Sequence, residues 1–566
     1  MASNQLNTLI AMASEQVRHL ARAQPPSEDV VLCAYLRSRE GARIGRDFAF
    51  ASLLAAPSAA ARYEAFRKLP ITDYTFYAPY IAAIEAGESD VLGPGQPSAL
   101  TLSGGSTNPG KQKLVPLYSD LRITHAGAAY VAALVFGKID EGQTYLNLVR
   151  PTPVERLPTT AAGHPIAMAS TFVESACSAA PWFSDTLERV PFALKCASAG
   201  VGAQYWHAIL PHALSQQRLR YIFAIYPNVV ISFLSCLEES IEGLVAALPD
   251  PRKQIDAAAP PLTPTRLAEL QAICATAQPF REKLARIWPD LDFAICVVTG
   301  GYSQYQKVLR DRYGLEAHTL SYGASEAALG FNFFDADRRF VPNPSTFFEA
   351  LHCGEDVSGS TDIVPLSRMM EGETYELIVT SPQSGFFRYR IGDVVRICRG
   401  AGQPRFEVIG RAQAVLSVAH EMTQEHHIRS VLDAVRHHAD YPELKDGPCF
   451  VAHDPDALRY VYAFETETLD MVRPRVMGLQ QILDQQMRAA NDLYQHYRVR
   501  GLIDLPEVLL VPLGSHHRAF QDQIQARGAD QNQTKPNIVI SQQTLEYLRA
   551  QLEAAPHGSE NPKSVP

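Results

Sequence analysis

Apolar runs with strand character alternate with helical stretches along most of this 566-residue chain. This alternation favours an α/β fold. We expect strands at residues 128–136, 294–299, 374–381, 394–398 and 508–512. We expect helices at residues 234–248, 265–277, 425–437 and 476–497, with Thr265 capping the second of them. With 46% hydrophobic residues, the chain is long enough for two or more packed domains.

Charge and composition exclude several classes of partner. The formal net charge is −9, and no Lys/Arg-rich run is present, so we expect no nucleic-acid partner. No apolar run approaches the roughly 20 residues of a membrane span. The apolar residues between Leu6 and Leu20 recur at helical spacing, which predicts a packing helix and not a signal peptide. None of the nine cysteines forms a Cys-x-x-Cys pair. Buried, reduced thiols in a cytoplasmic protein with no membrane association are therefore expected.

A glycine- and hydroxyl-rich loop at residues 103–113 is the first of three blocks that carry chemistry. Glycines let backbone N–H groups converge on an anion, and lysines offset phosphate charge. The candidate phosphate-binding residues are Ser103, Gly104, Gly105, Ser106, Thr107, Gly110, Lys111 and Lys113. An ordinary surface turn is the alternative. A P-loop is disfavoured, because Gln112 stands where Ser or Thr should hold magnesium and Pro116 interrupts the helix that should follow.

The second and third blocks suit a nucleotide. In Tyr322-Gly323-Ala324-Ser325-Glu326, the tyrosine offers a flat face for adenine and the glutamate a hard oxygen ligand for magnesium. The alternative is a helix N-terminus with Ser325 as its cap. Residues 374–393 predict a β-hairpin that ends at Asp393, whose carboxylate can accept hydrogen bonds from a ribose diol. The alternative for Asp393 is an ordinary turn residue.

Together with further segments in the same order, these blocks resemble the Gretchen Hagen family of acyl acid–amido synthetases. The family is best known for plant auxin- and jasmonate-conjugating enzymes and has bacterial members. The segments that carry the resemblance cover nearly the whole chain: residues 73–81, Ile287-Trp288-Pro289, residues 298–305, residues 375–380 and 387–394, residues 491–498 and Pro506.

The resemblance implies an acyl-adenylate-forming enzyme. Its fold would be a large N-terminal adenylation domain at residues 1–411, with β-sheets and helices and the ATP and acyl-acid sites. A smaller, mobile α/β domain at residues 412–554 would carry the catalytic lysine, and residues 555–566 would be a disordered tail. With ATP and Mg²⁺, such an enzyme converts a small carboxylic acid to acyl-AMP and pyrophosphate. It then transfers the acyl group to an amino acid or another amine and releases AMP.

Particular residues take roles from the resemblance. Lys535 and Glu326 are the implied catalytic residues, with Glu326 also the metal ligand. The implied adenine- and ribose-binding residues are Gly300, Gly301, Tyr322, Gly323, Ala324, Ser325, Asp393 and Arg411. A surface lysine is the alternative for Lys535.

The chain departs from the family pattern in several places. Asn108-Pro109 lengthens the phosphate loop, Met422 stands where a lysine is usual, and Pro536-Asn537 replaces the expected arginine context. Two alternatives therefore remain open, a ligase with a thiol acceptor such as CoA and a degenerate adenylate-binding protein. After Glu326 come Ala327-Ala328-Leu329, where relatives often carry a bulky aromatic residue, which indicates a roomier, more aliphatic acyl pocket. The candidate pocket residues are Tyr205, Trp206, Phe223, Tyr226, Ala328 and Leu329.

Overall fold

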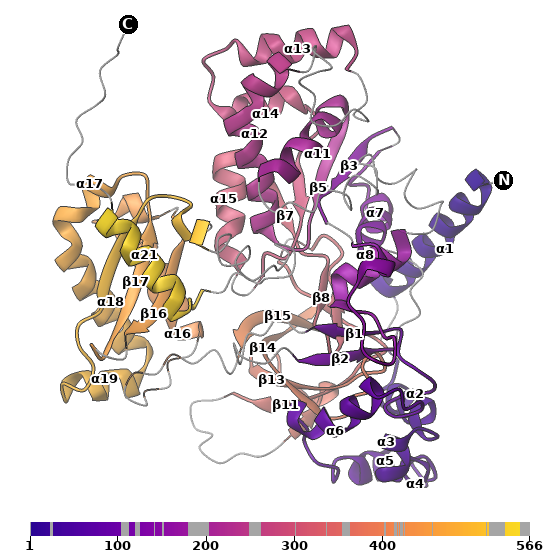
Figure 1. The fold of residues 1–566 in the computed structure, drawn as a ribbon. Coiled ribbons are helices and arrows are strands. Elements are labelled where there is room, and N and C mark those ends of the chain that lie inside the picture. The colour runs from indigo at the N-terminus through magenta and orange to yellow at the C-terminus, as the bar shows by residue number, and fades with distance from the viewer. Residues whose placement is uncertain are drawn as a thin grey trace, which may run out of the picture. The chain divides into compact units, whose positions relative to one another are not determined.

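A computed structural model of the chain describes most of its residues. The described residues are 2–22, 26–102, 113–118, 125–140, 142–149, 152–178, 203–247, 262–299, 302–335, 337–353, 363–400, 403–411, 416, 418, 421, 423, 425–445, 447–454, 457–516, 518–519 and 538–554. They divide into two compact units, one ending at Ile409 and one starting at Gly410 (Figure 1). This division falls next to the boundary expected near Arg411.

A parallel four-stranded sheet lies at the centre of one half of the first unit. Its order is β3 (Thr144–Asn147), β5 (Leu219–Phe223), β6 (Phe293–Ile295) and β7 (Glu316–His318). Leu146, Ile222 and Ala294 face a core that is shared with the helices from α11 (Ala203–Ser215) to α15 (Ser303–Tyr313). The neighbouring strand residues, such as Tyr145 and Tyr221, pack with alanines of α7 on the other face. Both faces of the sheet are therefore covered, as a parallel sheet requires.

The helices around this sheet have the following bounds: α7 (His125–Val135), α8 (Ala169–Ser178), α11 (Ala203–Ser215), α12 (Pro227–Ala247), α13 (Pro264–Cys274), α14 (Phe280–Ile287) and α15 (Ser303–Tyr313). Helix α1 (Ala2–Arg22) forms where the amphipathic pattern predicts a helix, and it contacts α7. Figure 1 shows α11, α12 and α15 beside the strands of the parallel sheet.

An antiparallel five-stranded sheet forms the other half of the first unit. Its order is β12 (Ile363–Pro365), β11 (Phe347–His352), β13 (Thr374–Thr380), β14 (Tyr389–Gly400) and β15 (Gln403–Arg411). It shares one core with five N-terminal helices, namely α2 (Glu28–Arg39), α3 (Arg43–Asp47), α4 (Phe50–Leu54), α5 (Ala59–Phe66) and α6 (Tyr74–Glu85). This core joins elements more than 250 residues apart and gives the third motif block a rigid support.

Two small sheets carry the first two motif blocks. In one, β1 (Ala99–Leu102) pairs antiparallel with β2 (Leu114–Leu117) and parallel with β4 (Ile166–Met168). In the other, β9 (Ala328–Phe331) lies between β8 (Ser321–Gly323) and β10 (Val341–Pro342). The first block therefore follows β1, and the second spans the turn between β8 and β9.

The second unit is a three-stranded sheet with helices on both faces. Strand β17 (Arg459–Glu465) pairs antiparallel with β16 (Cys449–Asp454) and parallel with β18 (Glu507–Val511). Alternate residues face opposite sides, as the period of two requires. Tyr460 and Tyr462 pack with α16 (Glu425–Arg436) and α18 (Val476–Ala490), while Val461 and Ala463 pack with α21 (Gln542–Ala554). Both units thus confirm the α/β class.

Three sequence predictions of local structure were wrong. Residues 128–136, expected as a strand, form most of helix α7, because alanine is the strongest helix former. The helix expected at 476–497 is two helices, α18 and α19 (Asp492–Val499), separated at Asn491, which has extended backbone angles. The cap of α13 is Thr263, whose hydroxyl oxygen accepts the N–H of Arg266 at 3.1 Å, with Pro264 as the first helical residue.

The remaining expected elements are present, with shifts at their ends. Strands β6, β13 and β18 and helices α12, α13 and α16 occupy the predicted stretches. No helix among the described residues combines the length and the apolarity needed to cross a membrane.

Candidate active site

The turn between β8 and β9 is held by polar bonds to segments far away in sequence. The N–H of Ala324 donates to the carbonyl of Ala327 at 2.8 Å and closes the turn. The Ser325 hydroxyl donates to the carbonyl of Leu102, the last residue of β1, at 3.3 Å. The Gln383 amide donates to the carbonyls of Ala324 and Ser325 at 3.2 and 3.0 Å. The second motif block therefore lies beside the point where the chain enters residues 103–112.

This geometry corrects one alternative drawn from the sequence. Residues 322–326 are a strand end and a turn, and Ser325 does not cap a helix. Its hydroxyl instead donates to a residue far away in the sequence, since Leu102 is 223 positions away.

Tyr322 joins the second block to the third. Its hydroxyl donates to Oδ2 of Asp393 at 2.8 Å, and its ring packs against Phe340 with centroids 5.5 Å apart. Asp393 was expected at a strand end but lies inside β14. The pairing of β13 with β14 is interrupted there: residues 391–393 stand opposite Leu377 alone, and Gly392 has φ +80°. A bulge of this kind turns a side chain out of the regular alternation, and here it accompanies the contact between Asp393 and Tyr322.

Glu326 lies near the first block as well as the third. Its Oε1 accepts a hydrogen bond from the Tyr389 hydroxyl at 3.3 Å. The Tyr74 hydroxyl accepts the N–H of Leu114 at 3.0 Å, and the Lys113 ammonium lies 5.3 Å from the centre of the Tyr74 ring. Burial raises the pKa of Tyr74, and the charge of Glu326 is among the smaller causes that raise it further.

Three residues of this arrangement were not singled out by the sequence reasoning: Tyr74, Gln383 and Tyr389. Tyr74 and Tyr389 do lie within the segments that carry the family resemblance, so their segments were identified but not their roles. Gln383 lies in the hairpin turn expected at 382–385, and nothing in the sequence distinguishes it from other turn residues. Only the folded chain shows that its amide reaches Ala324 and Ser325.

Arg388 gives the third block its support. The residue has φ +44°, a conformation that is rare for residues with a side chain, and it is buried. Its Nε donates to Oε2 of Glu349 at 2.9 Å, and its Nη1 donates to the carbonyls of Arg67 and Leu69. The arginine of this motif therefore fastens the strand start to the N-terminal helices, while the neighbouring Tyr389 reaches Glu326.

Several predicted site residues lie outside the described residues. They are Ser103, Gly104, Gly105, Ser106, Thr107, Gly110, Lys111, Gly300, Gly301 and Lys535. Arg411 ends β15, and Tyr205 belongs to α11. The structure brings together Lys113, Tyr322, Ala324, Ser325, Glu326 and Asp393 through the contacts given above, with Gly323 at the end of β8.

The predicted acyl-pocket residues do not gather in one hydrophobic cluster. Trp206 packs edge-on against Phe233 among the helices, Phe223 belongs to the opposite face of the parallel sheet, and Leu329 belongs to the core of the antiparallel sheet. Tyr226 is buried, with its ring 5.5 Å from that of Tyr302, and Ala328 is half-buried in β9. Tyr226 and Ala328 remain the better candidates, because the other three side chains fill hydrophobic cores.

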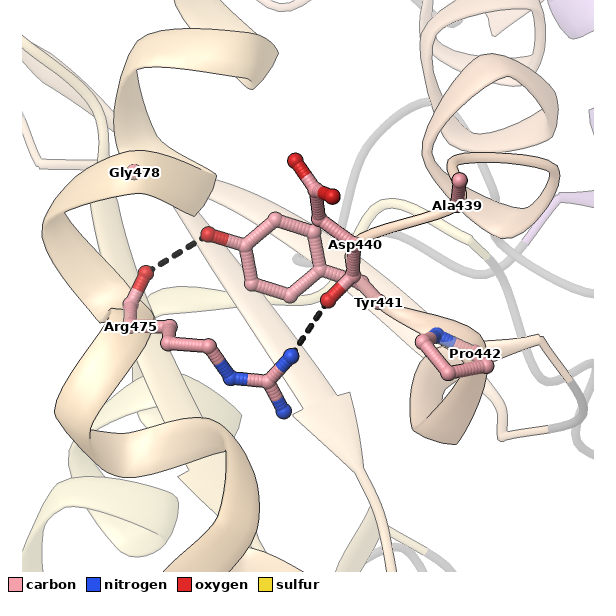
Figure 2. A pocket seen from close by; sticks show the side chains of 6 residues that line it. All are labelled: Ala439, Asp440, Tyr441, Pro442, Arg475 and Gly478. Carbon is pink, nitrogen blue, oxygen red and sulfur yellow. Dashed lines mark hydrogen bonds between the residues drawn. The ribbon is translucent and has the colours of Figure 1, made fainter.

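A hollow of about 500 Å³ in the second unit is lined by Ala439, Asp440, Tyr441, Pro442, Arg475 and Gly478. Figure 2 shows the Tyr441 hydroxyl directed at the carbonyl of Arg475 and the Arg475 guanidinium at the carbonyl of Asp440. The guanidinium also donates to Glu443 at 2.7 Å and to the carbonyl of Met471. These bonds join the loop before α18 to the loop after α16, and none involves a motif residue. We therefore place the candidate active site in the first unit.

No group of three or more His, Cys, Asp or Glu side chains among the described residues could hold a metal by itself. A lone carboxylate such as Glu326 nevertheless fits magnesium that arrives with a nucleotide. Mg²⁺ keeps several waters and is commonly held by one or two carboxylates together with substrate phosphates. The residues present are therefore compatible with Mg²⁺ as the companion of ATP.

Comparison with known families identifies three consecutive matches. Residues 13–316 match the GH3 family N-terminal domain, residues 340–411 its central domain and residues 427–544 its C-terminal domain. The chain belongs to the GH3 family. This is the family that the sequence resembles, and the relatives named below are acid-amido synthetases, which makes this chain an amido synthetase.

The relatives are plant proteins of moderate identity. Indole-3-acetic acid-amido synthetase GH3.8 of Oryza sativa subsp. indica is 26% identical over 538 residues, which cover 86% of this chain and 84% of the relative. Indole-3-acetic acid-amido synthetase GH3.10 of Arabidopsis thaliana is 26% identical over 64% of this chain and 67% of the relative. The probable synthetase GH3.9 of Oryza sativa subsp. japonica is 33% identical, but only 33% of its length is matched.

A solved structure establishes the fold over the whole length. The acyl acid amido synthetase AtGH3.15, in complex with 2,4-DB, has a TM-score of 0.74 and 21% sequence identity. The match covers 97% of this chain and 96% of that one. The fold of this family is therefore present in full, with a large N-terminal part and a smaller C-terminal one.

Proposed function

We propose that this protein joins a small carboxylic acid to an amino acid or another amine in two steps that consume ATP. The observation that carries the proposal is the meeting of the three motif blocks. Ser325 bonds to the residue before the phosphate loop, Tyr322 bonds to Asp393, and Tyr389 bonds to Glu326. Segments between 63 and 223 positions apart thus converge on one place, and each carries the chemistry that one part of ATP requires.

In the first step, an oxygen of the donor carboxylate attacks the α-phosphorus of ATP. The bond between the α-phosphorus and the bridging oxygen breaks, and pyrophosphate leaves with the bonding electrons. Negative charge grows on the phosphoryl oxygens and on the leaving group, so cations and fixed N–H donors stabilise the transition state more than the ground state. We assign this role to the glycine-rich loop, to Lys111 and Lys113, and to Lys535.

Two carboxylates take the remaining positions on the nucleotide. Asp393 would accept hydrogen bonds from the ribose diol, and the Tyr322 hydroxyl would orient its carboxylate. The ring of Tyr322 and the backbone of Gly323 and Ala324 would contact adenine. Glu326 would hold Mg²⁺, which when bound neutralises phosphate charge. The Tyr389 hydroxyl on Glu326 fixes the orientation of that carboxylate.

In the second step, the amine nitrogen attacks the acyl carbon. The bond to the AMP oxygen breaks, AMP leaves, and the nitrogen loses its extra proton to solvent. We propose that the second unit moves between the steps, so that Lys535 serves only the first.

The proposal is tested by ATP consumption across a panel of carboxylic acids, with hydroxylamine as the trapping amine. AMP and pyrophosphate with one or a few acids are expected, and ADP with phosphate would contradict adenylation. Amino acids and CoA are then compared as acceptors, and a thioester without an amide would redirect the proposal to a thiol ligase. Binding of ATP without turnover of any acid would leave only the adenylate-binding alternative.

Three variants test the assigned residues. Lys535→Ala should nearly abolish pyrophosphate release while leaving the fold intact. Tyr322→Phe removes one hydrogen bond to a charged group, so the KM for ATP should rise by about tenfold.

Ala328→Tyr should change the order of preference among donor acids without changing the KM for ATP. An unchanged donor order would remove Ala328 from the pocket.

A further inference from the structure

The turn that joins β13 to β14 directs one side chain at another motif block. Gln383 lies in this turn, and its Nε2 donates to the carbonyl of Ser325 at 3.0 Å and to that of Ala324 at 3.2 Å. Its backbone carbonyl accepts the N–H of Tyr118, the residue directly after β2, at 2.8 Å. Gln383 therefore joins the turn of the second block and the hairpin of the third to the sheet that flanks the phosphate loop.

The main chain around Gln383 is held by helix α2. The Arg39 guanidinium donates to the carbonyl of Pro382, and the Tyr35 hydroxyl donates to the carbonyl of Gly385 at 2.8 Å. Both of these helix residues are buried. Gly385 has φ +79°, and a Cβ there would lie 2.2 Å from a backbone carbonyl oxygen, so the turn requires glycine. The Gln383 side chain thus extends from a rigid base.

The bond to Ser325 acts on the peptide group that precedes Glu326. Because a peptide group is planar, the direction of the Ser325 carbonyl also sets the direction of the N–H and the Cα of Glu326. On the other side, the carbonyl of Ala327 accepts the N–H of Ala324 at 2.8 Å. The backbone of Glu326 is therefore held from both sides, and the Tyr389 hydroxyl then orients its carboxylate.

We propose that Gln383 is a positioning residue for Glu326, because its amide holds the peptide group between Ser325 and Glu326 and so directs the Glu326 side chain. This inference rests on the proposed function, in which Glu326 holds Mg²⁺. Gln383 contacts neither ATP nor the acid in this proposal. Without its two hydrogen bonds the peptide group would be free to rotate, and the carboxylate would occupy its working orientation for a smaller fraction of the time.

The chemistry of the contact requires a donor. Two backbone carbonyl oxygens face the Nε2 of Gln383, and a carbonyl oxygen can only accept, so the side chain between them has to donate twice. Methionine has the same length and no N–H or O–H group. Gln383→Met therefore removes the hydrogen bonds and keeps the volume of the side chain.

The direct measurement is the binding of Mn²⁺, used as a spectroscopic substitute for Mg²⁺. It is made in the presence of α,β-methylene-ATP, whose bridging carbon prevents the release of pyrophosphate, and unbound Mn²⁺ is followed by electron paramagnetic resonance. We expect the Mn²⁺ affinity of Gln383→Met to fall about tenfold, as is typical when a residue that orients a metal ligand is lost. An unchanged affinity would overturn the inference.

AMP without a divalent cation tests whether Gln383 acts on adenine instead. The same amide bonds the carbonyl of Ala324, whose backbone is assigned to adenine in the proposed function. Calorimetry should show AMP affinity within about twofold of that of the natural protein in Gln383→Met. A loss of AMP affinity equal to the loss of Mn²⁺ affinity would assign the effect to the adenine contact and contradict the inference.

Gln96→Met is the matched control. The Gln96 amide also donates two hydrogen bonds, to the carbonyl of Gly87 at 2.8 Å and to the Ser89 hydroxyl at 3.0 Å. Gln96 belongs to the same unit, and neither of its partners is a motif residue. This variant should change neither Mn²⁺ nor AMP binding. A loss of Mn²⁺ affinity equal to that in Gln383→Met would reduce the effect to a general loosening of the unit and overturn the inference.

A double-mutant cycle with Glu326→Gln decides whether Gln383 acts through the carboxylate. Gln383→Met should lower the Mn²⁺ affinity little further when residue 326 is already an amide. An equal loss on both backgrounds would overturn the inference while leaving the proposed role of Glu326 intact. An unchanged Mn²⁺ affinity in Glu326→Gln alone would overturn both.

The Mg²⁺ requirement of the first step gives a second readout that a purely structural residue would not move. The first step is measured as pyrophosphate exchange into ATP. In Gln383→Met the Mg²⁺ concentration for half-maximal exchange should rise about tenfold, while the rate at saturating Mg²⁺ stays within about twofold. A lower rate at saturating Mg²⁺ with an unchanged requirement would contradict the positioning role.

Discussion

Glu349 in the first unit and Glu465 in the second are both buried carboxylates, yet the protein stabilises them differently. Glu349 is 1% exposed and accepts hydrogen bonds from the Arg388 guanidinium at 2.9 Å and the Tyr63 hydroxyl at 3.3 Å. Glu465 is 3% exposed and accepts its bonds from two backbone N–H groups. Burial raises the pKa of both, to about 7 for Glu465.

The difference corresponds to what each carboxylate holds. Glu349 and Arg388 form a buried ion pair at the third motif block, where both partners lose their water and each depends on the other. Glu465 holds a turn of backbone at Gly514 and His516, and no cation of the described residues is bonded to its carboxylate, so it can bind a proton near neutral pH without leaving an unpaired charge. The attachment by Glu349 and Arg388 is therefore expected to be permanent, whereas the attachment by Glu465 can change with pH.

The largest expected effect comes from breaking the ion pair on one side. Arg388→Met leaves the Glu349 carboxylate buried without its cation, and such a loss typically costs about 3–5 kcal/mol. Urea unfolding should show this decrease in the free energy of unfolding. The double variant Arg388→Met/Glu349→Met removes both charges and should recover much of the stability. A single variant within about 1 kcal/mol of the natural protein would contradict the assignment of Arg388 as a support.

A smaller effect is expected from pH at Glu465. Its pKa in the folded protein is about 7, above the ordinary value of 4.5. The folded state therefore binds the proton more tightly. The corresponding stability is complete below the ordinary pKa and is lost as the pH rises through 7. Between pH 5.5 and 8 the loss attributable to Glu465 is about 2 kcal/mol.

The measurement for Glu465 is urea unfolding of the natural protein and of Glu465→Gln at both pH values. The difference between the two proteins isolates the contribution of this carboxyl group from that of all other titrating groups. Identical pH dependence of stability in the two proteins would show that the pKa of Glu465 is not raised. The contrast with Glu349 in pH dependence would then be wrong.

The smallest effect should come from the second donor of Glu349. Tyr63→Phe removes a hydroxyl whose hydrogen bond to Glu349 is 3.3 Å long, while the ring keeps its packing against Phe347. We expect a loss of about 0.5–1 kcal/mol in unfolding free energy, since the ion pair with Arg388 remains. A loss as large as that of Arg388→Met would mean that the hydroxyl and not the guanidinium stabilises the carboxylate.

The sequence predicted a large part of the fold, and it singled out three motif blocks that the folded chain connects by hydrogen bonds. Period and apolarity placed β13, β18, α12 and α16, because long patterned segments fold as their own propensities favour. Three short blocks indicated a nucleotide site before any contact was known. The wrong predictions were local. The alanine-rich residues of α7 fit the apolar pattern of a helix as well as that of a strand, and Thr263 and Thr265 are both acceptable helix caps.

The sequence by itself determined the α/β class, the family and the residue types that the chemistry needs, since these follow from short-range pattern and motif. Only the tertiary structure decided that Ser325 bonds to Leu102, that Asp393 lies on a bulge beside Tyr322, and that Glu465 fastens the turn at Gly514 and His516. Each of these bonds links residues between 49 and 223 positions apart. Local propensity does not specify such partners, which depend on the packing of the whole core.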